Sequence, residues 1–157
     1  MIKIGDTLPQ TKLQQLTSEG SQTLDNQQLF TGKKVLMFAV PGAFTPTCSN
    51  THLPGYVVNF DEFKTKGIDS IICLSVNDAF VMKAWGESQN AENIMMLADG
   101  DGEFTKALGL ESNTGAFGGL RSQRYAMLID DGVVTVLNVE APKKFEVSNA
   151  ETMLAAL

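Results

Sequence analysis

Residues 35–50 read VLMFAVPGAFTPTCSN, and this stretch decides how the chain can fold. Its first six residues are all apolar, which is typical of a strand buried on both faces of a sheet. Pro41 and Gly42 end that strand, because proline has no backbone N–H and glycine favours turns. Pro46 suits the first turn of a helix, where a missing N–H costs nothing. The sequence therefore predicts a strand, a turn and a helix whose first turn holds Cys48.

Cys48 is the candidate reactive residue. At a helix start its sulfur would face unpaired backbone N–H groups and the positive end of the helix dipole, and both stabilise the reactive thiolate. The alternative is that Cys48 is a small buried apolar residue, as free cysteines often are. The hydroxyl residues Thr45, Thr47 and Ser49 surround Cys48 in the sequence, and a purely structural cysteine needs none of them. We therefore expect a functional thiol.

The rest of the chain alternates between strand and helix patterns. Pro54 should kink or break the helix near Leu53, because proline removes a helical hydrogen bond. Residues 1–24 predict an irregular lead-in with a small hairpin, residues 99–102 a turn with a helix cap, and residues 111–120 a glycine-rich loop. The expected strands are 35–40, 68–76, 94–98, 122–129 and 133–139, and the expected helices are 25–30, from Cys48 to about Gly67, 78–85, 104–110 and 150–157. This order predicts an α/β fold with a central mixed sheet flanked by helices.

Composition narrows the possible functions. The length of 157 residues predicts a single domain spanning 1–157. The net charge of −6 argues against nucleic acid or an anionic membrane as a partner. The N-terminal residues lack an apolar signal core and no apolar run could span a bilayer, so a cytoplasmic location is expected. The two cysteines, Cys48 and Cys73, form no CxxC or zinc pattern and are expected to be thiols at rest. Neither a metal nor a cofactor is expected.

Residues 41–49, PGAFTPTCS, resemble the peroxidatic loop of peroxiredoxins, whose pattern is Pro, three residues, Thr or Ser, two residues and Cys. THLPG at 51–55 and CLSVNDAFV at 73–81 are similar to the type-5 subfamily in particular. The similarity extends from Gly5 to the last helix. It implies a thioredoxin-like fold and a thiol-dependent peroxidase that reduces hydrogen peroxide and alkyl hydroperoxides through a sulfenic acid on Cys48.

The resemblance also implies the site residues. The arginine of the family's pattern corresponds to Arg124 rather than to Arg121. Pro41 is expected to shield the Cys48 sulfur from water. Thr45 and the backbone N–H groups of Thr47 and Cys48 are expected to bind the peroxide. Without the resemblance, a catalytic Arg124 and a solvated strand residue are nearly equal alternatives.

His52, the only histidine, lies four residues after Cys48, which would place both on one helix face. A catalytic Cys–His pair is nevertheless disfavoured, because Pro54 disturbs the helix and no third orienting group is evident. A structural hydrogen bond is the expected role of His52.

The sulfenic acid must then be reduced. Many type-5 peroxiredoxins carry a resolving cysteine near the C-terminus, but residues 142–149 of this chain contain none. Cys73 lies within an apolar run and is expected to pack rather than to resolve. These features predict a bacterial-type, one-cysteine cycle in which an external thiol acts. The resemblance to family members that lack the third cysteine implies glutathione with glutaredoxin as the reductant, ahead of thioredoxin.

Two expectations concern partners. The resemblance implies a homodimer whose contact lies beside the active-site loop. The region of Phe44, Phe117, Gly118 and Gly119 is either an exposed apolar surface that would suit a partner or a loop that faces the core. The alternative function is that of a peroxide-sensing or holdase-like redox switch, in which oxidation of Cys48 changes a partner surface. The set of Thr45, Cys48 and Arg124 favours catalysis, because a sensor has less need of it.

Overall fold

The computed structural model describes residues 1–157 and contains two sheets. The larger sheet has the strand order β2-β1-β5-β4-β3-β8-β9, and β6 and β7 form a separate pair. Strands β3, β4 and β5 are parallel, whereas the β1–β2, β1–β5, β3–β8 and β8–β9 pairs are antiparallel. The predicted mixed sheet is confirmed. The strands are β1 (Lys12–Thr17), β2 (Gly20–Asp25), β3 (Lys34–Ala39), β4 (Ser70–Ser75), β5 (Met95–Ala98), β6 (Glu111–Asn113), β7 (Leu120–Ser122), β8 (Tyr125–Asp130) and β9 (Val133–Val139).

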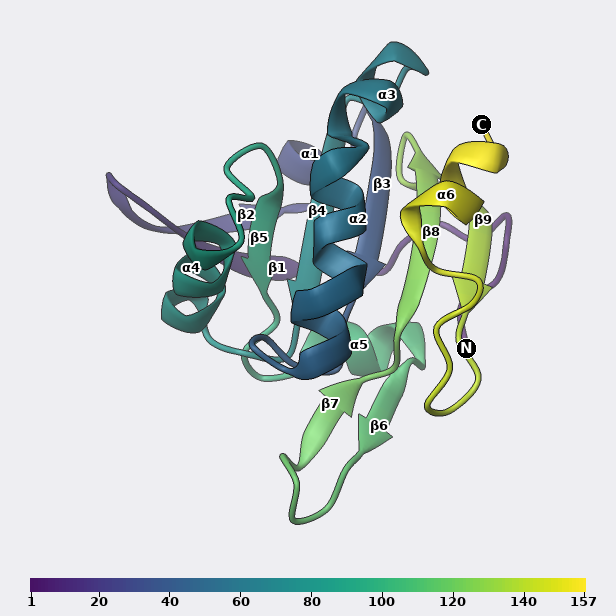
Figure 1. Cartoon of the computed structure of the whole chain (residues 1–157). Coiled ribbons are helices and arrows are strands. Elements are labelled where there is room, and N and C mark those ends of the chain that lie inside the picture. Colours follow the sequence, from purple (N-terminus) through teal and green to yellow (C-terminus); the bar gives the residue numbers. More distant parts are fainter.

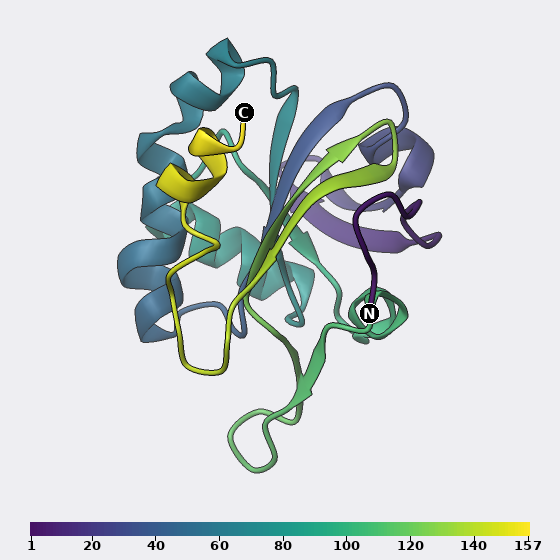
Figure 2. The same cartoon turned by 90° about the vertical axis from the view of Figure 1, so that its right-hand side faces the viewer.

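Helices cover both faces of the large sheet, as Figures 1 and 2 show. They are α1 (Asn26–Leu29), the π-helical turn η1 (Cys48–His52), α2 (Leu53–Val58), α3 (Phe60–Thr65), α4 (Ala79–Ser88), α5 (Glu103–Leu108) and α6 (Ala150–Ala155). One layer contains η1, α2, α3, α4 and α6, and α1 and α5 lie on the opposite face. None of these helices is long and apolar enough to cross a membrane.

The central strands explain why the sheet is buried on both faces. In β3, Leu36 and Phe38 pack in the core under α2 and α4, whereas Val35 and Met37 pack under α1 and α5. Successive side chains of a strand point to opposite faces, so an unbroken apolar run contributes to two cores at once. The run from Val35 to Val40 therefore becomes the middle of a three-layered molecule.

Two local expectations differ from the structure. The hairpin of residues 12–25 is longer and more regular than predicted, because β1 also pairs with the edge of β5. Residues 111–120 are not all loop, because β6 and β7 form a short antiparallel ladder. The residues of β6 and β7 are polar except for Leu120, so the sequence shows no alternating apolar pattern that would predict these two strands.

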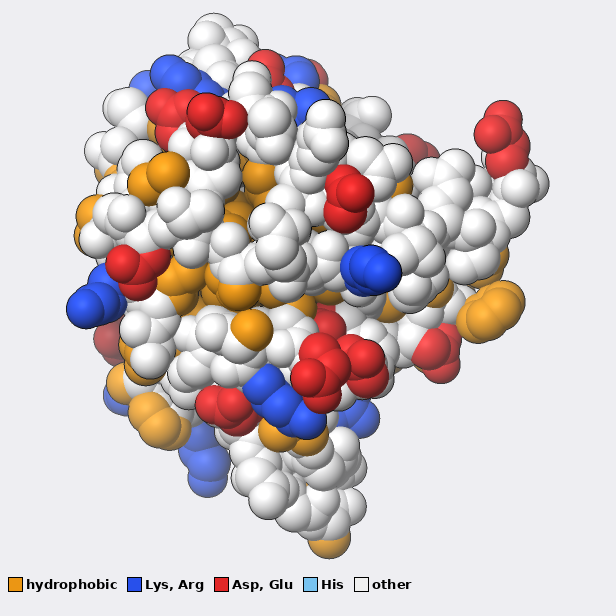
Figure 3. Space-filling view, turned by 180° about the vertical axis from the view of Figure 1, so that it is seen from behind, with side chains coloured by type: hydrophobic (Ala, Val, Ile, Leu, Met, Phe, Trp, Pro, Cys, Tyr) orange, Lys and Arg blue, Asp and Glu red, His pale blue; other side chains and the backbone are white.

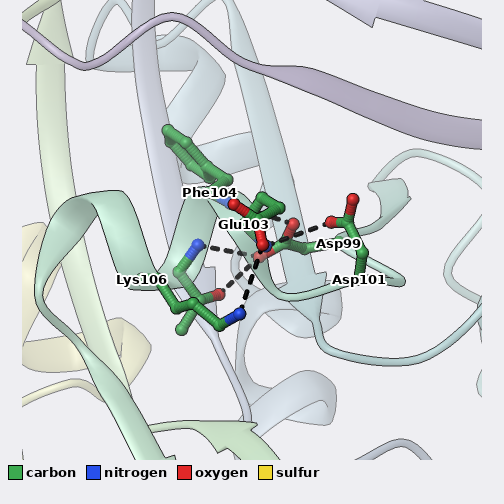
Figure 4. A network of polar contacts seen from close by, with 6 residues as sticks. Asp99, Asp101, Glu103, Phe104 and Lys106 are labelled. Carbon is green, nitrogen blue, oxygen red and sulfur yellow. Dashed lines mark hydrogen bonds and ion pairs between the residues drawn. The ribbon is translucent and has the colours of Figure 1, made fainter.

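The parallel strands end at one edge of the sheet, and polar side chains organise the turns there. Asn77, beyond β4, accepts a hydrogen bond from the backbone N–H of Ala43 at 3.0 Å, which ties the turn after β3 to the turn after β4. Asp99, beyond β5, lies at the start of α5 (Figure 4). Its carboxylate is 3% exposed and accepts from the N–H groups of Phe104 and Thr105 and from the Thr105 hydroxyl.

Replacement of Asp99 by asparagine should destabilise the fold. The amide keeps the shape of the side chain but loses the charge that three donors share, which should cost about 1–3 kcal/mol. Urea unfolding followed by circular dichroism measures this difference. An unchanged midpoint would contradict the assignment of Asp99 as a cap that stabilises α5.

Candidate functional site

Cys48 lies in the turn that connects β3 to α2. Helical backbone begins at Pro46, as predicted, and Cys48 is the first residue of η1. The N–H of Leu53 donates to the carbonyl of Cys48, which gives the wider spacing of a π-helix. Pro54 explains the irregularity, because a regular helix would bring its ring against a carbonyl four residues earlier. The expected disturbance near Leu53 is thus a π-helical turn that ends at His52.

Arg124 reaches the sulfur from the strand next to β3. Tyr125, the first residue of β8, pairs with Ala39 at the end of β3, so Arg124 lies beside the start of the Cys48 turn. Its Nη2 donates to the Sγ of Cys48 at 3.2 Å. The guanidinium is therefore a charged hydrogen-bond donor to the sulfur. The backbone N–H groups of Thr47 and Cys48, in the same turn, donate to no backbone carbonyl.

His52 holds the guanidinium in place. Its Nδ1 accepts from Nη1 of Arg124 at 2.8 Å, and its Nε2 donates to the carbonyl of Ser148 at 3.1 Å. These partners require the neutral ring with the proton on Nε2. Burial, and then the charge of Arg124, lower the pKa of His52 to about 3, so the ring stays neutral at physiological pH. His52 therefore acts on Arg124 rather than pairing with Cys48.

The remaining predicted residues surround the sulfur. The Thr45 hydroxyl donates to the carbonyl of Gly42 at 2.7 Å and not to the sulfur, which leaves its oxygen free to accept a further hydrogen bond. Cys48 itself is fully buried. Pro41, Thr47 and Arg124 all line a cleft outside it. The predicted residues are thus brought together, although Thr45 and Cys48 share no hydrogen bond.

The cleft has a volume of about 600 Å³ and opens beside Arg124. Its walls come from the Cys48 turn, from the β6–β7 hairpin and from the segment after β9, which approach one another in Figures 1 and 2. Lys143 and Lys144 line it and form no ion pair. The cleft therefore combines unpaired positive charge with access to the residues around the sulfur. Elsewhere charges are mixed, and the face in Figure 3 shows acidic and basic side chains interspersed.

Cys73 belongs to the core beside Cys48. It lies in β4, is fully buried and packs in the same apolar cluster as Cys48. Burial, and then the electrostatic effect of the neighbouring Cys48, raise the pKa of the Cys73 thiol well above its ordinary value. A protonated, enclosed thiol is a poor nucleophile. Both cysteines are free thiols.

Arg121 has a different role from Arg124. Its Nε donates to the carbonyl of Gly118 at 3.0 Å and its Nη1 to the carbonyl of Val76 at 2.9 Å. These contacts hold the β6–β7 hairpin against the end of β4.

Three residues of the site were not found from the sequence. They are Glu140, Phe145 and Ser148, all on the segment that follows β9. The ring of Phe145 packs against that of His52 at 4.9 Å between centroids and lies 5.8 Å from the Arg124 guanidinium carbon. A region of mixed polar residues without periodicity carries no sequence signal for such contacts. In addition, no group of three or more His, Cys, Asp or Glu side chains is arranged to hold a metal ion.

The comparisons with known proteins agree with this geometry. The redoxin family matches residues 3–154. Peroxiredoxin-2D of Arabidopsis thaliana is 48% identical over 159 residues, covering 99% of this chain and 98% of its own. The crystal structure of reduced Prx3 from Vibrio vulnificus in complex with H2O2 is 70% identical, with a TM-score of 0.98 and 99% of each chain covered. Peroxiredoxin 5 of Alvinella pompejana is 39% identical, with a TM-score of 0.87, 99% of this chain and 97% of its own covered.

The matches span nearly the whole chain. A cysteine and an arginine are also in contact at the start of a helix. Together these findings assign the chain to one family. The chain belongs to the redoxin family and is a peroxiredoxin of the type-5 kind, a thiol-dependent peroxidase.

Proposed function

We propose that Cys48 is the peroxidatic residue and that it reduces hydrogen peroxide and alkyl hydroperoxides. The observation that carries this proposal is the 3.2 Å contact between Nη2 of Arg124 and the Cys48 sulfur. The thiolate attacks one peroxide oxygen, the O–O bond breaks, and the other oxygen leaves as hydroxide or alkoxide and takes up a proton. The sulfur is oxidised to a sulfenic acid and the peroxide is reduced to water or an alcohol.

The surrounding groups suit the charge that develops in this reaction. Arg124 and the unpaired N–H groups of Thr47 and Cys48 are donors to the leaving oxygen. The Thr45 oxygen can accept the peroxide O–H, because its own hydrogen is used by Gly42. Pro41 restricts access of water to the sulfur. The Vibrio vulnificus relative whose structure contains H2O2 supports hydrogen peroxide as a substrate.

The same proposal includes a one-cysteine cycle. An external thiol condenses with the sulfenic acid to give a mixed disulfide and water, and a second thiol then releases Cys48 and carries away the disulfide. Glutathione with glutaredoxin is the proposed reductant, with thioredoxin as the alternative. The cleft supports this choice, because Lys143, Lys144 and Arg124 provide positive charge for a thiol that carries carboxylates.

We further propose a homodimer in the cytoplasm. Phe44 is 55% exposed and Phe117 is 72% exposed, although large apolar side chains are usually buried. Phe44 also has a positive φ of 65°, which places its ring outside the active-site turn, 6.5 Å from the centroid of Trp85. A second subunit that covers Phe44 would therefore contact the turn that holds Cys48.

Replacement of Cys48 by serine should abolish peroxide consumption, because a hydroxyl does not replace the thiolate as nucleophile.

Replacement of Arg124 by glutamine should lower the rate constant for oxidation of Cys48 by about 10²–10³-fold, the usual cost of one donor to a developing oxyanion. Arg121→Gln is the matched control and should react at a rate close to that of the wild type. Stopped-flow measurement with hydrogen peroxide tests all three variants. An equal loss in both arginine variants would contradict the proposed role of Arg124.

Replacement of Cys73 by alanine should leave steady-state turnover with glutathione and glutaredoxin intact, because an external thiol resolves the sulfenic acid. The measurement is continuous loss of hydrogen peroxide with excess reductant. If turnover were lost while Cys48 was still oxidised, the one-cysteine cycle would be wrong. If the wild type stopped after about one equivalent of peroxide per chain, the redox-switch alternative would replace catalysis.

Light scattering coupled to size exclusion should show a dimer at micromolar concentration. Phe44→Ser should shift the population toward monomer, because it removes apolar area from the proposed contact. Phe80→Ser is the control, since Phe80 is 71% exposed but lies on α4 rather than on the active-site turn. A monomeric wild-type protein would refute the dimer.

A further inference from the structure

Glu140 is a buried carboxylate that the peroxidase chemistry does not use. It follows β9, is 6% exposed and is the acceptor for four groups of residues 146–148. The backbone N–H of Glu146 donates to both carboxylate oxygens, and the N–H groups of Val147 and Ser148 and the Ser148 hydroxyl donate to Oε2, all at 2.7–2.9 Å. Burial alone would raise the pKa of Glu140, but the hydrogen bonds from Ser148, Glu146 and Val147 hold it below its ordinary value.

The sheet places Glu140 next to the catalytic arginine. Val139 pairs with Tyr125, and the N–H of Glu140 donates to the carbonyl of Arg124 at 2.9 Å. The carboxylate nevertheless forms no ion pair with the guanidinium, because residues 146–148 occupy both of its oxygens. The negative charge beside Arg124 is therefore directed to the C-terminal segment, and the guanidinium remains free for Cys48 and His52.

The segment that Glu140 holds in turn holds His52. The carbonyl of Ser148 accepts from Nε2 of His52 at 3.1 Å and from the hydroxyl of Tyr56 at 2.6 Å. A carbonyl can only accept, so it keeps the proton of the imidazole on Nε2. The lone pair on Nδ1 then points to Arg124 and accepts from its Nη1. If Ser148 moved, both the tautomer and the position of the ring would become free.

We infer that Glu140 is a positioning residue for the peroxidatic site, which acts through Ser148 and His52 to place the guanidinium of Arg124 against the Cys48 sulfur. This inference rests on the proposed roles of Cys48 and Arg124. The Glu140 side chain lines the cleft but forms no hydrogen bond with the Cys48 sulfur or with the guanidinium, so it acts on them through Ser148 and His52. Metal-binding histidines depend in the same way on groups that hold their second nitrogen.

The test compares Glu140→Gln with Asp99→Asn. Both residues are buried carboxylates that accept from backbone N–H groups and from a hydroxyl, and both changes keep the side-chain shape. Only Glu140 is linked to the site, so Asp99→Asn controls for a general loss of stability. In Glu140→Gln the amide NH₂ group would face N–H donors, which displaces residues 146–148.

The first measurement is the rate constant for oxidation of Cys48 by hydrogen peroxide in a single turnover. Glu140→Gln should lower it by about ten- to a hundredfold, since misplacing a catalytic group by about 1 Å costs up to about a hundredfold. Asp99→Asn should leave it at the wild-type value. Equal rates in the two variants would overturn the inference.

The second measurement does not depend on activity. His52 is the only histidine, so a ¹⁵N-histidine-labelled sample gives one pair of imidazole signals. The wild type and Asp99→Asn should show one protonated and one unprotonated nitrogen, and Glu140→Gln should move both signals toward their average. If the wild type shows this signature but consumes no peroxide, the proposed function fails and the positioning of His52 stands. Unchanged signals in Glu140→Gln would overturn the inference.

A third variant keeps the test decisive if Glu140→Gln does not fold. Ser148→Ala removes the hydroxyl that donates to Glu140 but keeps the backbone carbonyl that accepts from His52. It should shift the histidine signals in the same direction by a smaller amount and slow the oxidation of Cys48 by less. Signals and rate equal to those of the wild type would count against the inference.

Discussion

The contact between the Arg124 guanidinium and the Cys48 sulfur is the interaction on which the site depends. Its partners lie 76 residues apart in the chain. They meet because β8 pairs with β3 in a register that sets Tyr125 against Ala39. A shift of one residue in that register would turn Arg124 to the other face of the sheet, because successive side chains alternate. Burial of both faces of β3 and β8 is what makes such a shift costly. The hydrophobic core thus determines the geometry of the reactive centre.

A second constraint concerns the imidazole between the arginine and the C-terminal segment. His52 is buried between charged neighbours, and its low pKa keeps it neutral, so that it can accept a hydrogen bond from Arg124 without adding a competing positive charge. Glu140, in contrast, stays charged. Burial alone would raise its pKa, but its hydrogen bonds hold the pKa below the ordinary value. The site therefore keeps one group neutral and one group ionised, each through its own hydrogen-bond partners.

The cleft and the core place the charged and the apolar groups of the site in different surroundings. The cleft is lined by Pro41 and Thr47, from the turn that holds Cys48, and by Arg124, which contacts the Cys48 sulfur. Lys143 and Lys144 also line the cleft. Cys73, in contrast, is enclosed within the core and protonated, so its surroundings suit packing. These differences follow from position in the sheet, because β4 is a central strand and the Cys48 turn lies beyond a strand end.

The sequence by itself determined the α/β class, the positions of most strands and helices, and the importance of residues 41–48. These are local properties, since apolar runs, prolines and capping residues act on their chain neighbours. The sequence also singled out Arg124, but only through its resemblance to a family, because nothing local separates it from Arg121. Only the tertiary structure decided which arginine reaches the sulfur, that Thr45 bonds to Gly42, and that Glu140 and Ser148 support His52. The physical reason is that these contacts join residues far apart in the chain, and their geometry comes from strand register and core packing, which no single segment encodes.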